Sequence, residues 1–169
     1  MQLEGMLFLY IGKRIYDLPK DYTWSFDENI IPFGLKINGN NWLEKNISLR
    51  AVLNKKWQLG SEIDREIITK YYVVTWGGVI ANSDITLRNY AKGNFIGLIQ
   101  LQENRIASWS KVISIIHPDR FAIFDARVSV SLNLLQLIYK VDNMVLYPIL
   151  PSKNKTIKKI NEQLRKMNC

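Results

Sequence analysis

The chain has 169 residues, of which 47% are hydrophobic and 22% are charged. These proportions are those of one globular domain, and they exclude a collagen-like repeat or a chain that is disordered throughout. Lys and Arg number 23 against 15 acidic residues, which gives a net charge of +8. Six basic residues and one acid lie between Ser152 and Cys169. This segment is either a solvated terminal helix or the contact for a polyanion such as nucleic acid.

The cysteine content and the apolar runs indicate the compartment. The single cysteine, Cys169, excludes an intrachain disulfide and a cysteine cluster for structural zinc. The longest early apolar run, Met6 to Ile11, is much shorter than the roughly 20 residues that cross a bilayer. It also lacks the basic start of a signal peptide. We therefore expect a cytoplasmic protein that has no membrane contact, no metal and no cofactor.

The organisation along the chain predicts a single domain over 1–169. The sequence contains no internal repeat and no linker that would separate two domains. Residues 1–42 form an irregular N-terminal part with turn signals at Pro19, Pro32 and Asn38-Gly39. This part has room for short strands near Met6–Ile11 and Phe33–Ile37.

From Trp42 onward, apolar residues recur at helical spacing between glycines, prolines and capping residues. Ser61 and Asp64 have the spacing of a capping box, whereas Gly77-Gly78 and His117-Pro118 are signals that end a helix. The predicted helices are 42–60, 61–76, 83–93, 106–116, 126–140 and 152–169, and 94–101 is either helical or extended. The expected fold class is mainly α, with about seven helices.

One segment, Ile106 to Val128, combines residues that carry chemistry. It places Lys111 on a predicted helix, then a loop, then Asp125 at the start of the next helix. Because one helix leads out and the loop leads back, the two side chains are expected to meet in one cleft. An amine can attack an anomeric carbon and form a Schiff base if its pKa is lowered by desolvation or a nearby cation. A carboxylate stabilises the positive charge that develops on the sugar. The pair therefore suits cleavage of an N-glycosidic bond.

The local motifs support this interpretation. Ser110-Lys111-Val112 and Ala122-Ile123-Phe124-Asp125 resemble the catalytic segments of the helix-hairpin-helix DNA glycosylases, most closely the small prokaryotic 8-oxoguanine DNA glycosylase (OGG-fold) proteins. The resemblance covers about the last 100 residues. It implies a compact helical bundle with a helix-hairpin-helix-like catalytic part over 76–150 and a basic terminal helix over 152–169. It also implies Lys111 as nucleophile and Asp125 as electrostatic partner.

The resemblance implies a ligand and a partner as well. The ligand would be DNA or a modified guanine base, contacted by Trp76, Trp109, Arg127, Lys153, Asn154 and Lys155. Small OGG-fold proteins also resemble components of bacterial antiphage operons of the CBASS type, which implies a protein partner from such an operon. The glycines that hold a DNA phosphate in the family's hairpin fall at Ala107 and Trp109, so the grip on duplex DNA is expected to be weak.

Several of these residues also have a purely structural interpretation. Asp125 is a common helix N-cap, and Lys111 alone would be a solvent-facing helix lysine. Trp109 suits hairpin packing, and His117 suits the end of a helix better than a metal site. Three hypotheses therefore stand: a lysine-dependent N-glycosylase with lyase activity, a non-catalytic module that binds nucleic acid or a modified base, and a partner-binding subunit of a defence complex.

Overall fold

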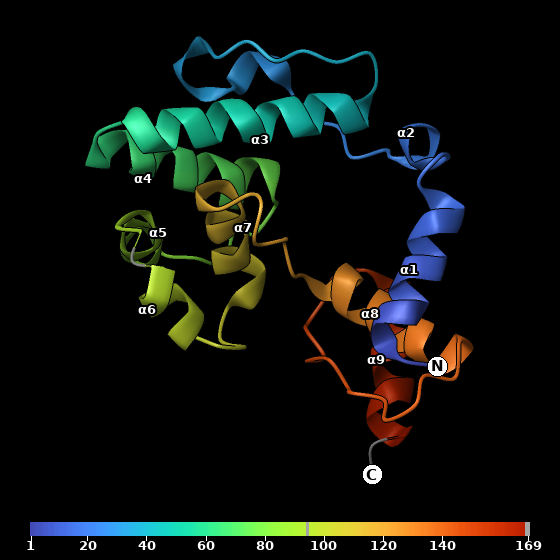
Figure 1. Cartoon of the computed structure of the whole chain (residues 1–169). Helices are drawn as coiled ribbons and strands as arrows, with labels where there is room; N and C mark the ends of the chain where they lie inside the picture. Colours follow the sequence, from blue (N-terminus) through green and yellow to red (C-terminus); the bar gives the residue numbers. More distant parts are fainter. Residues whose placement is uncertain (94, 168–169) are drawn as a thin grey trace. The chain divides into compact units, whose positions relative to one another are not determined.

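The computed structural model describes residues 1–93 and 95–167, and these contain nine α-helices and no strand (Figure 1). The predicted mainly α fold class is confirmed. The count exceeds seven because the N-terminal part holds two α-helices, α1 (Leu3–Arg14) and α2 (Leu18–Asp21). In the described part of the chain, no helix has the length and apolar character to cross a membrane.

Both strands that the sequence suggested near the N-terminus are wrong. Residues 6–11 lie inside α1, whose first turn contains Glu4 and whose last turn contains Lys13 and Arg14. Charges of these signs stabilise the two ends of a helix dipole, and the apolar run lacks the alternation of a half-buried strand. Residues 32–34 form a short 3-10 helix, and 35–39 form no regular element.

The chain divides into two compact units. The larger unit is Tyr16–Ile123, and the smaller unit consists of Met1–Ile15 together with the described part of Phe124–Cys169. The sequence suggested one domain because it contains no linker. The division follows from the pattern of tertiary contacts, and no composition change marks it between Ile123 and Phe124. Cys169, which bears on the predicted compartment, lies outside the described residues.

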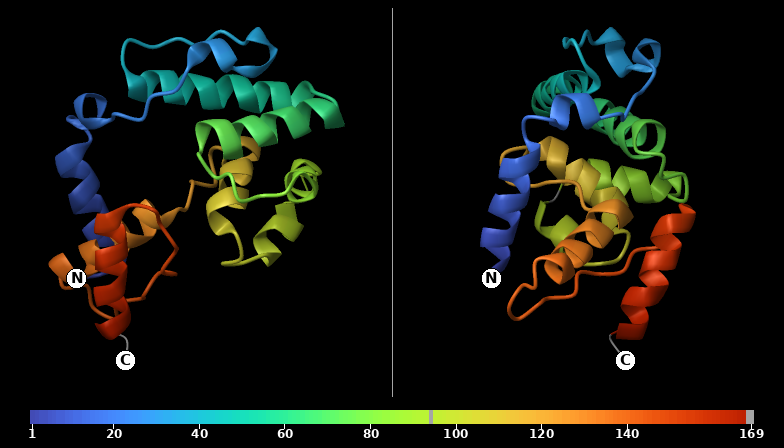
Figure 2. Two further views of the ribbon diagram at one scale, coloured as in Figure 1. Left: turned by 180° about the vertical axis from the view of Figure 1, so that it is seen from behind. Right: turned by 90° about the vertical axis from the view of Figure 1, so that its right-hand side faces the viewer.

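The helices predicted between Trp42 and Ile116 are present in the larger unit. Local capping explains their starts: the Asn41 side chain accepts the N–H of Glu44, and Ser61 and Asp64 form the predicted capping box. Figure 2 shows α3 and α4 side by side. In chain order the unit contains α2, η1 (Glu28–Ile30), η2 (Pro32–Gly34), α3 (Trp42–Leu59), α4 (Glu62–Lys70), the π-helix η3 (Tyr71–Trp76), α5 (Asp84–Ala91), α6 (Phe95–Gln100) and α7 (Ile106–Ile116).

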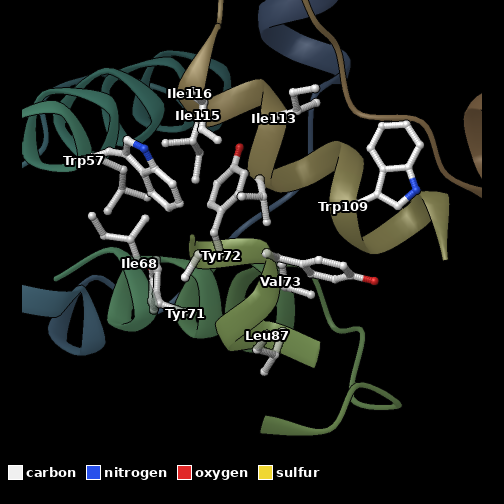
Figure 3. Close-up of a cluster of buried hydrophobic side chains, with 14 of the residues drawn as sticks. Trp57, Ile68, Tyr71, Tyr72, Val73, Leu87, Trp109, Ile113, Ile115 and Ile116 are labelled. Carbon is white, nitrogen blue, oxygen red and sulfur yellow. The ribbon is translucent and has the colours of Figure 1, made fainter. Parts of the chain in front are cut away.

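Helix α7 is the centre of the larger unit. Every residue from Ser108 to Ile116 is buried, and the helix contacts α3, η3, α5 and α6. Its last carbonyls are satisfied by α3, because Asn54 Nδ2 donates to Ile115 O at 2.6 Å. Ile113 and Ile115 face a cluster of buried side chains from the neighbouring helices (Figure 3). Side chains on α7 are therefore enclosed by the four neighbouring elements of the larger unit.

The smaller unit contains three helices, α1, α8 (Ala126–Ile138) and α9 (Lys155–Met167). Both α1 and α9 pack against α8. The predicted amphipathic terminal helix is confirmed, since Ile157, Asn161 and Leu164 are buried on one face of α9. The helix begins at Lys155, later than the sequence suggested, because Asn154 Oδ1 accepts the N–H of Ile157.

Side-chain amides hold the extended segment between α8 and α9. Gln136 Nε2 donates to Val145 O at 2.9 Å, and Val145 N donates to Gln136 Oε1 at 3.0 Å. Asn133 forms the same reciprocal pair with Tyr147, at 3.1 and 2.8 Å. Both amide side chains are 1% exposed. These two side chains therefore form the hydrogen bonds that a neighbouring strand would otherwise form with this backbone.

We predict that Gln136→Leu lowers the free energy of unfolding by at least about 2 kcal/mol, because it leaves the N–H and C=O of Val145 without partners. Urea denaturation measures the change. Gln163→Leu on the exposed face of α9 is the matched control and should change stability by less than about 0.5 kcal/mol. Equal effects of the two substitutions would show that the amide pairing does not stabilise the unit.

Candidate functional site

Lys111 lies in the middle of α7 and is buried. Its side chain is 3% exposed, and Nζ donates to Ala107 O at 2.6 Å, one turn earlier in the same helix. The alternative of a solvent-facing lysine is therefore wrong. Lysine is among the residues that proteins bury least often, so a buried lysine on a central helix is a candidate for function.

Gly77 makes room for the Lys111 side chain. A Cβ atom at position 77 would lie 2.5 Å from Lys111 Cε and 2.7 Å from Cδ, so the methylenes pass directly over the glycine. The same Cβ would lie 2.8 Å from Tyr72 O. Gly77 follows η3 as the predicted helix-ending residue. Its contact with α7 has no local signal in the sequence.

The π-helix η3 carries two stacked aromatic rings beside this contact. Tyr72 and Trp76 stack with centroids 4.3 Å apart and an interplanar angle of 6°. Trp76 Nε1 donates to Asn46 Oδ1 at 2.9 Å, and Asn46 Nδ2 donates to Trp24 O at 2.8 Å. Single π-turns inside helices are rare and often occur at functional sites. Trp76, a predicted base-binding residue, is thus fixed immediately before Gly77.

Polar groups continue from Lys111 toward Tyr72. Ser114 Oγ donates to Lys111 O at 2.7 Å and also interacts with the Tyr72 hydroxyl. Burial raises the pKa of Tyr72 far above its usual value, while the positive charge of Arg50 opposes that rise. Tyr72 is therefore a neutral phenol at physiological pH. The sequence had not singled out Tyr72, Ser114 or Arg50, since each is an ordinary residue in its own helix.

Trp109 packs inside the larger unit. It is 8% exposed, and its Nε1 donates to Asn104 O at 3.1 Å. This favours a structural role in packing over the predicted role as an open platform for a base.

The turn that precedes α7 lies earlier than the positions at which the resemblance places the hairpin glycines. Ala107 and Trp109 are both inside α7, and the connection from α6 to α7 is residues 101–105. The backbone conformations that favour glycine occur there at Gln102 and Arg105, with φ of 48° and 57°. The shift has a physical reason: no glycine, proline or Asn-Gly pair marks this turn in the sequence.

The remaining predicted site residues belong to the smaller unit. Asp125 Oδ1 accepts the N–H groups of Arg127 and Val128 at 2.8 and 3.1 Å, so its N-cap role is confirmed. Arg127 Nη1 lies 3.8 Å from the other carboxylate oxygen. Lys111 belongs to the larger unit and Asp125 to the smaller one, so their meeting in one cleft stays a prediction.

The start of α9 holds the last predicted contacts. Asn154 is used in capping, and its own N–H donates to Ser152 Oγ at 3.1 Å. Lys153 and Lys155 on either side of it are exposed. Their contact with nucleic acid stays a prediction. His117 closes α7, as expected, and its ring packs edge-on against Phe95 at 5.3 Å.

A hollow of about 320 Å³ lies away from Lys111, between α5, α6 and the hairpin turn. Its lining is mixed polar and apolar and includes Asn89, Tyr90, Leu98 and Arg105. Within residues 1–93 and 95–167, no group of three or more His, Cys, Asp or Glu side chains is arranged to hold a metal ion.

No family model matches the chain, and comparisons with curated proteins and with solved structures found no significant match either.

We predict that Gly77→Ala lowers the free energy of unfolding by about 1–3 kcal/mol, because the new methyl group would overlap with Lys111 and Tyr72. Shortening the lysine should relieve part of this cost. A double-mutant cycle of Gly77→Ala with Lys111→Ala should therefore give a coupling of at least about 0.5 kcal/mol.

The matched control for this cycle is Gly12→Ala. A Cβ at Gly12 would meet nothing within 4 Å, and the residue lies in α1, where alanine is the better helix former. This substitution should leave stability unchanged or raise it. A Gly77→Ala protein as stable as the Gly12→Ala protein would show that Lys111 does not need the space over Gly77.

Proposed function

We propose that the chain is a lysine-dependent N-glycosylase of the helix-hairpin-helix type that acts on a purine or modified guanine base in nucleic acid. The observation that carries this proposal is the burial of Lys111 on α7 against the backbone of Gly77. An amine attacks only in its neutral form, and removal from water is one means by which proteins favour that form.

The reaction assigns a step to each of two residues. The Lys111 amine leaves Ala107 O and attacks the anomeric carbon of the nucleotide. The bond from that carbon to the base breaks, its electron pair goes to the base, and the base takes up a proton. As the sugar ring opens, the bond from the anomeric carbon to the ring oxygen breaks and its electron pair goes to that oxygen. Of the two protons of the neutral amine, one supplies the departing base and the other the ring oxygen, which leaves the imine. Asp125 is assigned the stabilisation of the positive charge on the sugar during base departure.

The charge distribution supports a polyanionic substrate. The smaller unit contains ten of the basic residues and four of the acids, so it accounts for +6 of the net charge of +8. On α9, Ile157 and Leu164 are buried on one face, and the basic residues of the helix are exposed: Lys155, Lys158, Lys159, Arg165 and Lys166. A basic face of this kind attracts phosphates regardless of base sequence.

A non-catalytic module that binds nucleic acid or a modified base is the second candidate. The hydrogen bond from Lys111 Nζ to Ala107 O favours it, because a lysine with a main-chain partner can be purely structural. A partner-binding subunit of a defence complex, using the basic face of α9, is the third candidate. Neither of these alternatives forms a covalent adduct with a sugar.

We predict that borohydride traps a covalent complex of the wild-type protein with DNA, and that Lys111→Met abolishes it. Methionine retains an unbranched chain over Gly77 but has no amine. Duplexes and single strands carrying 8-oxoguanine or a deazaguanine are the substrates, with guanine as reference. Lys55→Met, at an exposed lysine of α3 in the larger unit, is the control and should trap as the wild type does.

Asp125→Asn separates the two roles of Asp125 in the same assay. Asparagine caps a helix about as well as aspartate, so folding should be retained while base release falls sharply. Full activity of this variant would leave Asp125 with its capping role alone. A wild-type protein that releases no base and traps on none of the substrates would make the binding module the better account.

We further predict that binding to DNA depends steeply on salt through α9. Replacing Lys155, Lys159 and Lys166 by Gln should make the slope of log K against log salt less negative by about 2–3 for duplex DNA, because each phosphate contact contributes about 0.9. The same change at Lys36, Lys55 and Lys92, exposed lysines of the larger unit, is the control. An equal effect of both triple variants would show that α9 is not the contact.

A further inference from the structure

The hollow between α5, α6 and the turn before α7 has the size of a small-molecule site. Its volume of about 320 Å³ falls within the roughly 300–1,000 Å³ that is usual for such sites. Both α5 and α6 contact α7, and Figure 1 shows the three helices next to one another. The residues that line the hollow all belong to the larger unit, and Lys111 is not among them.

Tyr90 forms part of the floor of this hollow and has an unused hydroxyl. The residue is 3% exposed, and its hydroxyl has no hydrogen-bond partner among the described residues. The hydroxyl is also not one of the unpartnered atoms enclosed in the core, so it opens to the hollow that Tyr90 lines. Burial raises the pKa of Tyr90, and the positive charge of Arg105 opposes that rise. The hydroxyl is therefore protonated at neutral pH and can both donate and accept.

Arg105 lies at the opening of the same hollow and is held through one of its nitrogens. Its Nη1 donates to Ala81 O and Asn82 Oδ1, at 3.5 and 3.3 Å, and Asn82 Nδ2 donates to Ser108 Oγ at 2.9 Å. Within residues 1–93 and 95–167, no carboxylate lies within 4.0 Å of this guanidinium, and the lining of the hollow contains no acid. The remaining N–H groups of Arg105 form the fork of donors that a phosphate accepts.

The rest of the lining suits a flat, uncharged group that has a hydrogen-bonding edge. The side-chain amides of Asn89 and Asn104 are exposed at the opening, and each offers donors and an acceptor. Leu98, which is 4% exposed, and Leu101 supply apolar surface. Side-chain amides pair with the edges of nucleobases, and apolar side chains pack on the faces of the bases. One cation, two amides and an apolar surface therefore match the single phosphate and the single base of a mononucleotide.

We propose that this hollow binds a nucleoside monophosphate. The phosphate accepts hydrogen bonds from Arg105, and the base pairs with the amides of Asn89 and Asn104. The base packs on Leu98, and the Tyr90 hydroxyl binds a polar atom of the ligand at the floor of the hollow. This site is separate from the surroundings of Lys111, and its occupation does not rest on the proposed glycosylase reaction.

Titration of the full chain with the four 5′-ribonucleoside monophosphates, followed by amide and tyrosine-ring NMR signals, tests the site. With at least one nucleotide we expect shifts at the residues that line the hollow, among them 89, 90, 98 and 105. The affinity for that nucleotide should exceed the affinity for its nucleoside and for inorganic phosphate by about tenfold or more, because each of these fills only part of the hollow.

Variants of Arg105 and Tyr90 identify the contacts. Arg105→Gln should lower the affinity about tenfold or more, and Arg105→Lys, which retains the charge without the planar fork, should bind with intermediate affinity. Arg88→Gln removes an exposed guanidinium of α5 that does not line the hollow, and it should bind as the wild type does. Tyr90→Phe should weaken binding severalfold and leave the thermal unfolding midpoint unchanged, because the hydroxyl has no partner in the described part of the chain.

Other outcomes would overturn the inference. These are the absence of shifts at the hollow with all four nucleotides, undiminished binding by Arg105→Gln, or equal binding of benzoate, which would replace the nucleotide by organic anions in general. Shifts confined to α9 or to the surroundings of Gly77 would also reject the hollow as the site. Nucleotide binding at the hollow of a protein that traps no DNA would retain this inference and reject the glycosylase. Trapping without shifts at the hollow would do the reverse.

Discussion

The larger unit depends on a close approach between two segments, because the methylene chain of Lys111 crosses directly over Gly77. Any side chain at position 77 would occupy the space of Lys111 Cδ and Cε. The approach also fixes η3, since Tyr72 O lies against the same position and the Tyr72 ring stacks on Trp76. A single glycine thus lets a lysine side chain enter a core that is otherwise mainly apolar.

This constraint explains why polar residues collect around α7. Once a lysine is buried, its amine and the main chain around it need hydrogen-bond partners within the unit. Ala107 O accepts from the amine, and Ser114 Oγ donates to Lys111 O. On α3, Asn46 accepts the N–H of Trp76 and Asn54 donates to Ile115 O, which extends the same polar region. The candidate site is therefore a set of polar side chains on α3 and α7, and Lys111 lies among them.

The sequence predicted those features that have local causes. Ser61 with Asp64, Ser83 before α5 and Asp125 before α8 are caps, and each lies where its sequence pattern indicated. A cap is settled by residues two or three positions apart, so one sequence contains all the information. The helix α7 itself was likewise predicted, although its burial and the inward direction of Lys111 were not.

Features that depend on distant contacts were not predictable. Gly77 gave only the signal of a helix end, and its contact with Lys111 joins segments far apart in the chain. In the turn before α7, the residues with positive φ are Gln102 and Arg105. Because neither is a glycine, the sequence does not mark this turn. In the smaller unit, Gln136 pairs with the backbone of Val145 where a strand would ordinarily do so. Such amide pairing has no periodic pattern, so only the three-dimensional arrangement reveals it.

The identity of the attacking amine tests the central claim most directly. After borohydride reduction of the complex with a DNA substrate, peptide mass spectrometry locates the residue that carries the sugar. The account predicts attachment to Lys111, the buried lysine of α7. Attachment to the amino group of Met1 or to a lysine of α9 would contradict it, because the reactive amine would then be an exposed one and the burial of Lys111 against Gly77 would have a structural role only.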